Sequence, residues 1–442
     1  MADLPLVRNH ETGAVFAYFD RRPVTLSRFL GHVSQLAAAL PRRRHMINLC
    51  ADRYRFVVGF AAALLRQQLS LLPPNTAPDL VERLEHDYPD AYCLTDAVTG
   101  SPAAETVVFP ALGDGATVSS VPVIRETQVA AILFTSGSTG YPVPHQKTWR
   151  SLVTGARAEA ERLSLRTGLA LLGTVPPQHM YGLESTVLLP MQNGLALHGC
   201  RPFFPADIRA ELDVLPRPRG LITTPVHLRA LLDEPHAVPP VDFLLCATAP
   251  LSPQLAARAE ERFATPLYEI YGCTEAGQVA ARRTVESPEW RTLADLTLRQ
   301  DASGTWAGGG HAEQPVLLAD VIELRGPQTF LLHGRTADLV NIAGKRTSLA
   351  HLDYHLNSIE GVCDGAFVMP DEGDDAVTRL MAFAVAPGVS GDSIMQALRQ
   401  RIDAAFLPRP LYLVESLPRN STGKLPRAAL DFLRTGRARK AG

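Results

Sequence analysis

The sequence predicts an α/β fold, with a large N-terminal domain of parallel and mixed sheets flanked by helices and a small α+β domain at the end. Two observations support this prediction. Short apolar runs alternate with helical segments through residues 1–130, which is the spacing of a parallel sheet with crossover helices. The 442 residues are also enough for two or more domains with a substantial buried core.

Composition places the chain among globular proteins. Hydrophobic residues make up 46% and charged residues 20%, and a formal net charge of −2 predicts no general attraction to nucleic acid or anionic membranes. No apolar run reaches membrane-spanning length, and the start of the chain has no export signal. The six cysteines are scattered without a Cys-x-x-Cys pair, which argues against a zinc site or a disulfide framework. We therefore expect a cytoplasmic protein that does not insert into membranes.

The first elements follow from hydrophobic periodicity. The segment Leu26–Leu40 is amphipathic and predicts a helix, and the apolar segment Phe56–Leu65 predicts a buried helix. Short apolar runs predict strands at Met46–Cys50, Leu69–Leu72 and Tyr92–Asp96.

A hydroxyl- and glycine-rich loop follows the next expected strand, Ala131–Phe134. The loop residues are Thr135, Ser136, Gly137, Ser138, Thr139 and Gly140. Glycines let successive backbone N–H groups turn toward an anion, and hydroxyls add neutral donors, so the loop suits phosphate. It is not a Walker A loop, because no Gly-Lys-Ser/Thr follows at the required spacing. On composition alone, a flexible connector is the alternative.

The middle of the chain continues the alternation. We expect a helix at Ser151–Leu163 and a strand at Ala170–Val175, which ends in a proline-led loop. This loop contains His179, Tyr181 and Gly182, and by its spacing alone it is an ordinary structured turn.

Two later strands end in small or polar residues. After an expected strand and helix start at Gly220–Leu228, the strand Asp242–Leu251 runs into Ala247, Ala249 and Pro250, which leave room for a flat ring. The segment Pro266–Gly277 then places Thr274 and Glu275 between Gly272 and Gly277. A carboxylate at a strand end could hold Mg²⁺ against phosphate oxygens. A Thr-Glu pair is also a common helix start.

Together these segments resemble the acyl-adenylate-forming superfamily, which includes acyl-CoA synthetases, adenylation domains of peptide synthetases and luciferase. The resemblance covers nearly the whole chain and five separated motifs in the family order. The loop matches the family signature through Gly140 and Pro142 and departs at Val143, where most members carry lysine. The nearest lysine is Lys147, a variant that looks like the short acid–thiol ligases of aryl polyene and xanthomonadin-type pigment pathways. Lys147 is either a contact for the leaving pyrophosphate or a solvated surface lysine.

The resemblance implies roles for the residues named above. It implies that Tyr271 stacks on the adenine of ATP, that Thr274 meets the α-phosphate, and that Glu275 binds Mg²⁺ with Thr139. Ala249, Pro250 and Gly272 would border the nucleotide, together with the signature loop and Lys147. The implied acid-pocket residues are His179, Tyr181, Gly182, Ala247 and Gly277.

The resemblance also implies a ribose site. Glycines punctuate residues 300–315 and predict loop or hairpin turns. Beyond them, Asp320 and Arg335 have the family spacing, in which the aspartate accepts both ribose hydroxyls and the arginine reaches the ribose. A carboxylate is the natural bidentate acceptor for a diol. The alternative for Asp320 is a turn or cap residue.

The last hundred residues predict a compact α+β unit. We expect helices at Leu349–Ser358 and Ser393–Phe406 and strands at Gly365–Met369 and Arg379–Ala386. The resemblance divides the chain into an adenylation domain, residues 1–336, and a mobile lid, residues 337–442.

The resemblance gives the lid three functional residues. Ala337 aligns with the hinge, where members usually carry Asp or Lys, and a hinge needs only a residue that tolerates a large φ/ψ change. Gly344 would let a pantetheine arm pass, and Arg346 is the implied swinging basic residue. Lys424 matches the mobile lysine that touches carboxylate and phosphate during adenylation. By itself it would be a solvated lysine.

The expected function is a two-step ligation. A carboxylic acid attacks the α-phosphate of Mg·ATP, giving acyl-AMP and pyrophosphate, and a phosphopantetheine thiol of CoA or a holo acyl carrier protein then displaces AMP. The catalytic candidates are Lys424, Glu275, Thr274 and His179. The resemblance favours an aromatic acid such as 4-hydroxybenzoate. The alternatives are a medium-chain or hydroxy fatty acyl ligase and a non-catalytic nucleotide- or acyl-binding relative.

Overall fold

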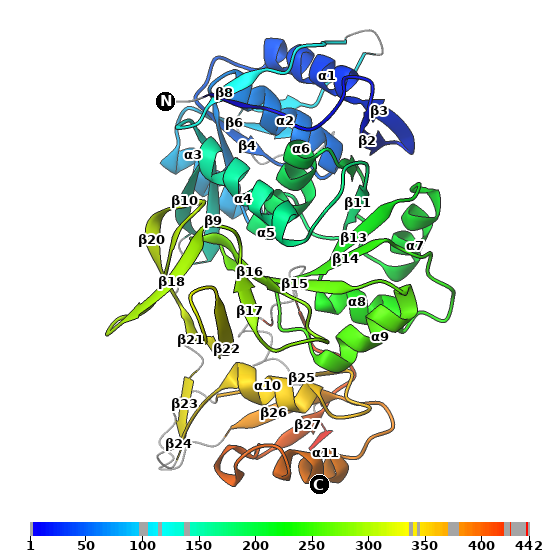
Figure 1. Ribbon diagram of the computed structural model, residues 1–442, viewed down its shortest axis with the longest axis vertical. Coiled ribbons are helices and arrows are strands. Elements are labelled where there is room, and N and C mark those ends of the chain that lie inside the picture. Colours follow the sequence, from blue (N-terminus) through cyan, green and yellow to red (C-terminus); the bar gives the residue numbers. More distant parts are fainter. Residues whose placement is uncertain are drawn as a thin grey trace.

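The computed structural model in Figure 1 describes residues 3–96, 105–113, 117–136, 142–335, 339–342, 345–369, 380–419, 425 and 439–440. The N-terminal elements, blue to green, form the upper and middle parts of the molecule, and the C-terminal sheet, orange, lies at the bottom. The architecture is the predicted α/β arrangement of a large N-terminal part and a smaller C-terminal unit.

A six-stranded sheet forms one side of the N-terminal part. Its strand order is β10-β9-β5-β4-β6-β7, and all pairs are parallel except β9 with β10. Its strands are β4 (His45–Asn48), β5 (Leu69–Leu72), β6 (Ala91–Thr95), β7 (Thr106–Val108), β9 (Val129–Ser136) and β10 (Pro142–Thr148). The connecting helices are α1 (Leu26–Ala39), α2 (Arg53–Leu65) and α3 (Pro78–Asp87). The predicted strands and helices here are confirmed, whereas α3, β7 and β10 were not predicted.

An eleven-stranded sheet carries the strand ends that matter for the site. Its order is β21-β22-β17-β16-β15-β14-β13-β11-β12-β2-β3, and the run from β2 to β15 is parallel. The parallel strands are β2 (Val15–Phe19), β11 (Ala170–Gly173), β12 (Ala196–His198), β13 (Arg219–Thr223), β14 (Phe243–Cys246) and β15 (Leu267–Cys273). The antiparallel ones are β3 (Arg22–Thr25), β16 (Gly277–Arg282), β17 (Trp290–Thr292), β21 (Asp320–Leu324) and β22 (Thr329–Arg335). Because parallel strands end at one edge, the residues after β11, β13, β14 and β15 converge there.

Capped helices connect these strands. Asp52 accepts a hydrogen bond from the Arg55 N–H at the start of α2, and Ser252 accepts one from the Leu255 N–H. The second cap precedes α9. Its first residue is a proline, and the missing N–H of proline removes no intrahelical hydrogen bond in the first turn. The remaining helices of this part are α4 (Trp149–Arg162), α5 (Met180–Leu183), the π-helical turn Glu184–Leu188, α6 (Leu189–Asn193), α7 (Pro205–Val214), α8 (Pro225–Leu232) and α9 (Pro253–Phe263).

Three small sheets complete the chain. The predicted hairpin turns in residues 300–315 connect β18 (Leu296–Asp301), β19 (Gly304–Gly309) and β20 (Ala312–Leu318). Two short pairs are β1 (Asp3–Pro5) with β8 (Val123–Arg125) and β23 (Leu339–Ile342) with β24 (Lys345–Ser348). None of the helices in the described ranges is long and apolar enough to cross a bilayer.

The C-terminal unit has its own sheet and core. The sheet contains β25 (Asp364–Val368), β26 (Met381–Val385), β27 (Leu411–Leu413) and β28 (Arg439–Lys440), and α10 (Leu349–Asn357) and α11 (Gly391–Arg399) pack with it. The predicted helix Ser393–Phe406 is wrong in extent. Helix α11 ends at Arg399, and Asp403 accepts the Ala405 N–H to start a separate 3₁₀ turn. The expected boundary at 336/337, with the hinge at Ala337, lies outside the described residues.

A fully buried arginine connects the two large sheets. Arg53, in α2, is 0% exposed. Its guanidinium donates to the Thr186 hydroxyl and to four main-chain carbonyls, of Gly173, Val175, His198 and Cys200, at 2.8–3.0 Å. Burial lowers the pKa of Arg53 to about 10. One side chain thus joins a helix of the first sheet to the ends of β11 and β12 in the second.

A fully buried carboxyl group lies in α4. Glu159 is 0% exposed, and its Oε1 accepts a hydrogen bond of 2.6 Å from the Ser185 hydroxyl. Burial raises the pKa of Glu159 to about 7, because the interior disfavours the charged form.

We predict that Arg53→Met lowers the free energy of unfolding by about 3–5 kcal/mol, because it leaves several buried carbonyls without donors. Arg53→Lys should recover only part of this loss, since an ammonium cannot reach so many acceptors in the plane of a guanidinium. Urea denaturation measures both changes. Arg55→Met, on the same helix, is the control and should change stability by about 1 kcal/mol or less. Equal losses in Arg53→Met and Arg55→Met would contradict the account.

We also predict a pH-dependent effect of Glu159→Gln. Between the ordinary glutamate pKa of 4.5 and the folded value of about 7, the folded protein holds a proton that the unfolded chain has released, so stability falls as pH rises. The stability of the variant relative to the wild type should therefore increase by roughly 2–3 kcal/mol from pH 4.5 to pH 8. Denaturation at a series of pH values measures this difference. Glu161→Gln alters an exposed glutamate of the same helix. A similar trend in that control would refute the assignment to Glu159.

Candidate active site

The signature loop lies in the hairpin between β9 and β10. Strand β10 turns back on β9 so that Val143 pairs with Thr135. Thr135 is described in full. The loop residues Gly137, Ser138, Thr139 and Gly140 and the Ser136 side chain lie outside the described residues.

An accessible carboxylate lies beside the base of this loop. The Thr135 hydroxyl is 3.0 Å from His145 Nε2, which is 3.7 Å from Glu275 Oε1. The Glu275 side chain is 45% exposed. Burial lowers the pKa of His145, so the ring is neutral at neutral pH. An exposed carboxylate next to a hydroxyl-rich loop is a donor set that suits Mg²⁺.

Lys147 is buried. Its side chain is 6% exposed, and Nζ donates a hydrogen bond of 2.7 Å to the main-chain carbonyl of Glu275. The alternative of a solvated surface lysine is therefore wrong. Burial lowers the pKa of Lys147, and the negative charge of Glu184 acts in the opposite direction.

His145 was not among the residues predicted for the site. A signal was present, because side chains alternate along a strand and His145 and Lys147 therefore share one face of β10. Both residues reach Glu275 from that face. Neither the strand nor its partner could be derived from periodicity, since this segment lacks an alternating apolar pattern.

Tyr271, in β15, contacts Asp320 at the start of β21. The Tyr271 hydroxyl donates to Asp320 Oδ2 at 2.7 Å. The Tyr271 ring is 8% exposed, with its centroid 5.8 Å from those of Trp290 and Phe330. Asp320 pairs with Arg335 across β21 and β22, although the Arg335 side chain lies outside the described residues. The predicted nucleotide residues Tyr271 and Asp320 are thus adjacent in space.

Two glycines let the β15–β16 turn close. A Cβ on Gly272 would lie 2.5 Å from the Gly277 carbonyl oxygen. Gly277 has a φ of +79°, and a Cβ there would lie 2.8 Å from Glu184 Oε1. Thr274, between them, is half-buried. Both glycines therefore have a structural reason to be present, which the motif alone did not reveal.

Four of the expected acid-pocket residues lie near the ends of β11, β13 and β14, whereas Gly277 begins β16. His179 precedes the first turn of α5, and a Cβ on Gly182 would lie 1.9 Å from the Pro176 carbonyl oxygen. The Tyr181 hydroxyl is within hydrogen-bonding distance of the Thr223 and Leu245 carbonyls, at 3.2 and 3.3 Å. Gly182 and Tyr181 thus fix the local backbone. Ala247 is buried next to this edge, directly after β14.

A strained residue follows Ala247. Thr248 has a φ of +84°, which is rare for a β-branched side chain. Its buried hydroxyl has no hydrogen-bond partner among the described residues. Ala249 is half-buried and Pro250 is exposed. Strain of this kind concentrates at functional sites, so Thr248 adds to the candidate nucleotide border.

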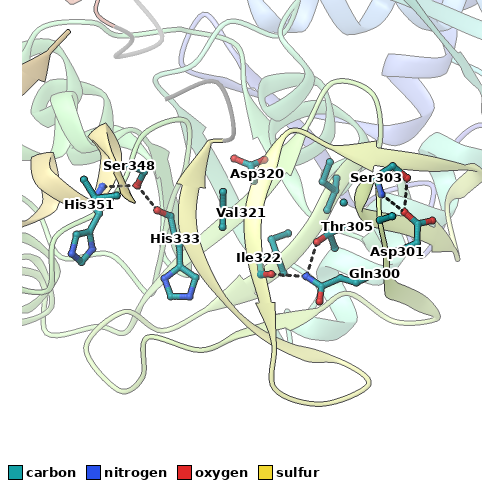
Figure 2. A pocket seen from close by; sticks show the side chains of 14 residues that line it. Gln300, Asp301, Ser303, Thr305, Asp320, Val321, Ile322, His333, Ser348 and His351 are labelled. Carbon is teal, nitrogen blue, oxygen red and sulfur yellow. Dashed lines mark hydrogen bonds between the residues drawn. The ribbon is translucent and has the colours of Figure 1, made fainter. Parts of the chain in front are cut away.

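A cavity next to this site contains Asp320 in its lining but not Glu275. It has a volume of about 590 Å³ and lies between the β18–β19 turn, β21, β22 and the start of α10. Figure 2 shows His333, Ser348 and His351 on one side of it and Asp301, Ser303 and Thr305 on the other. Asp320 lies between these groups. Among the residues that line the cavity, only Asp320 was predicted as a site residue, so the cavity does not define the reaction centre.

Several expected lid residues cannot be placed. Gly344, Lys424 and the Arg346 side chain lie outside the described residues. Their roles stay predictions.

A different cluster has potential metal ligands. In the described part of the chain, His198, Cys200 and Glu211 have ligand atoms within 4.8 Å of one another. The Cys200 N–H donates to His198 Nδ1 at 3.2 Å. With Nδ1 accepting, Nε2, 3.2 Å from Glu211 Oε2, carries the proton of the neutral ring, so a metal at Nε2 would require the other tautomer and the loss of this Cys200 contact. The exposed carboxylate of Glu275 is the better candidate.

Comparison with known proteins agrees with the motifs. Residues 33–297 match the model of the AMP-binding enzyme family. A 4-coumarate–CoA ligase of Halorhodospira halophila is 30% identical over 66% of this chain and 73% of its own. A 3-hydroxybenzoate–CoA/4-hydroxybenzoate–CoA ligase of Thauera aromatica is 23% identical over 75% of this chain and 71% of its own.

Solved structures support the fold. An anthranilate CoA ligase in complex with anthranoyl-AMP superposes with a TM-score of 0.81 at 16% identity, covering 97% of both chains. A benzoate CoA ligase from Burkholderia xenovorans LB400 superposes with a TM-score of 0.78 at 18% identity, covering 95% of this chain and 97% of its own. The predicted fold class is therefore confirmed. The chain belongs to the AMP-binding enzyme family and, as its motifs predicted, is an AMP-forming acid–thiol ligase.

Proposed function

We propose that the enzyme adenylates an aromatic carboxylic acid, with 4-hydroxybenzoate as the first candidate, and transfers the acyl group to the thiol of CoA. The observation that carries this proposal is a pair of carboxylates on either side of Tyr271: Glu275 lies in the β15–β16 turn, and Asp320, at the start of β21, accepts a hydrogen bond from the Tyr271 hydroxyl. Relatives named for 4-coumarate, hydroxybenzoates and 2-succinylbenzoate support an aromatic acid. Transfer to a holo acyl carrier protein, as in the pigment-pathway ligases that the loop resembles, is the alternative second step.

The nucleotide would bind along the β14 and β15 ends. Asp320 would accept the two ribose hydroxyls, because the Tyr271 hydroxyl already orients its carboxylate. Arg335 would reach the same ribose. The Tyr271 ring would contact the adenine, which Ala249, Pro250 and Gly272 would border.

The phosphates would lie between the signature loop and Glu275. Glu275 and Thr139 would hold Mg²⁺, which when bound neutralises charge that develops on the phosphate oxygens. Thr274 would donate to the α-phosphate. The other donors would be Thr135, Ser136, Gly137, Ser138 and Gly140, because hydroxyls and backbone N–H groups together can surround an anion.

The chemistry needs no protein nucleophile. A carboxylate oxygen of the acid attacks the α-phosphorus, and the bond to the pyrophosphate oxygen breaks, giving acyl-AMP. His179, Tyr181, Gly182, Ala247 and Gly277 would border the acid at the converging strand ends. Positioning and charge stabilisation supply the catalysis.

In the second step a thiol replaces AMP on the acyl group. A phosphopantetheine sulfur attacks the acyl carbon of acyl-AMP, and AMP leaves with the bonding electrons. We propose that residues 337–442 rotate as a lid between the steps, so that Lys424 serves adenylation and Gly344 and Arg346 line the path of the thiol arm.

We predict that Lys424→Ala lowers the rate of acyl-AMP formation about 10²- to 10³-fold, because a positive charge that stabilises the transition state is lost. ATP binding should be largely retained, since the other contacts remain. Pyrophosphate release and equilibrium ATP binding measure the two effects. Lys440→Ala, at another C-terminal lysine, is the control. Unchanged adenylation in Lys424→Ala would remove this lysine from the mechanism.

The experiment that tests the proposed function is pyrophosphate release from ATP with a panel of aromatic and fatty acids, with CoA or a holo carrier protein as acceptor. We expect the highest kcat/KM with a hydroxybenzoate and thioester formation on CoA. A higher kcat/KM with medium-chain or hydroxy fatty acids would contradict the aromatic substrate and identify a fatty acyl ligase. ATP binding without release for any acid would favour a non-catalytic nucleotide-binding role.

A further inference from the structure

The turn that carries Glu275 rests on a buried polar cluster. The members of this cluster are Lys147, Glu184, Gln278 and His311, which are 2–6% exposed. They come from β10, the π-helical turn, β16 and the β19–β20 turn. None of them belongs to a motif that the sequence analysis used for phosphate or metal, apart from the assignment of Lys147 to the pyrophosphate.

Each contact in the cluster fixes the main chain next to Glu275. Lys147 Nζ donates to the Glu275 carbonyl at 2.7 Å. The Gln278 N–H donates to Glu184 Oε1 at 3.3 Å, on the other side of Gly277. The His311 ring packs against Gly277, where an added Cβ would lie 3.3 Å from Cδ2. The backbone from Glu275 to Gln278 is therefore held at both ends.

The Glu275 side chain is exposed, unlike the members of this cluster. It is 45% exposed, whereas Lys147 on the inner side of the turn is 6% exposed. His145, two residues before Lys147, lies 3.7 Å from the Glu275 carboxylate. Strand β10 thus contacts both parts of Glu275: His145 is near its side chain, and Lys147 binds its main chain.

We propose that Lys147 is a positioning residue that acts through Glu275: its hydrogen bond to the Glu275 carbonyl orients the exposed carboxylate toward Mg²⁺ bound to ATP. This inference rests on the proposed nucleotide and metal site. It differs from the expected contact between Lys147 and pyrophosphate, because a buried Nζ that donates to the main chain of the turn is not directed at solvent-accessible phosphate. The hydrogen bond needs an N–H donor at the reach of a lysine side chain.

The test measures ATP affinity with and without Mg²⁺ by calorimetry on the full-length protein, so it does not depend on the identity of the acid. In the wild type, Mg²⁺ should increase the affinity for ATP. Lys147→Met should reduce this Mg²⁺-dependent gain about tenfold, as expected when a partner that orients a metal ligand is lost. The affinity for ATP without Mg²⁺ should stay near the wild-type value.

A double variant separates action through Glu275 from direct contact with phosphate. Glu275→Gln should remove the Mg²⁺-dependent gain, and adding Lys147→Met to it should cause no further loss. If Lys147 contacted phosphate directly, Lys147→Met would weaken ATP binding without Mg²⁺, and the two losses would multiply. That result would overturn the inference.

Arg219→Met is the matched control for a merely structural effect. Arg219 is also buried, at 7% exposed, and its guanidinium donates to the Leu215 and Pro240 carbonyls. It lies at the amino end of β13, opposite the edge that carries the site. This variant should lower thermal stability and leave the Mg²⁺-dependent gain unchanged. A reduced gain in the control equal to that of Lys147→Met would overturn the inference.

Two further outcomes are decisive. If Lys147→Met does not fold, Lys147→Gln replaces it in the same measurement. The amide nitrogen of glutamine is one bond closer to the main chain than the lysine Nζ, so it should not restore the hydrogen bond to the Glu275 carbonyl. If the folded variant keeps the full Mg²⁺-dependent gain in ATP affinity, the positioning role of Lys147 is overturned, but the proposed metal site is not. A wild type without any Mg²⁺-dependent gain would overturn the proposed metal site as well.

Discussion

The fold depends on one buried guanidinium. Arg53 joins α2, which covers the first sheet, to the carboxyl ends of β11 and β12 in the second. Burying a charged group is unfavourable, and it is tolerated here because every donor direction meets an oxygen. Two of its acceptors, the carbonyls of Gly173 and Val175, directly precede the loop that contains His179. The same interaction that holds the sheets together therefore fixes the start of the candidate acid-binding edge.

Much of the fold could be predicted because local patterns agreed with it. The amphipathic Leu26–Leu40 and the apolar Phe56–Leu65 became α1 and α2, and the apolar run Leu69–Leu72 is β5. Strand β10 could not be predicted, because its residues show no apolar alternation and it forms by pairing with β9. The helix expected at Ser393–Phe406 is shorter because the Asp403 side chain accepts the Ala405 N–H and starts a separate 3₁₀ turn. Such local competition is not visible in periodicity.

The site was predictable where a motif combines several residue types, as in Tyr271 to Glu275. It was not predictable where a side chain acts from a distant segment. His145 and Lys147 reach Glu275 across 128 or more positions, a contact that only the tertiary fold produces. Gly182 and Gly277 also gained an explanation from the structure, since neighbouring oxygens leave no room for a Cβ. Motif glycines can thus serve the backbone as well as the ligand.

The central claim is that the β15–β16 turn, the β9–β10 loop and Asp320 form one nucleotide site. The measurement that tests it most directly is a crystal structure of the protein with Mg²⁺ and a non-hydrolysable ATP analogue. The account predicts the ribose hydroxyls on Asp320, the metal on Glu275 and the phosphates against the β9–β10 loop. A nucleotide bound wholly in the cavity of Figure 2, with Glu275 free of metal, would contradict it.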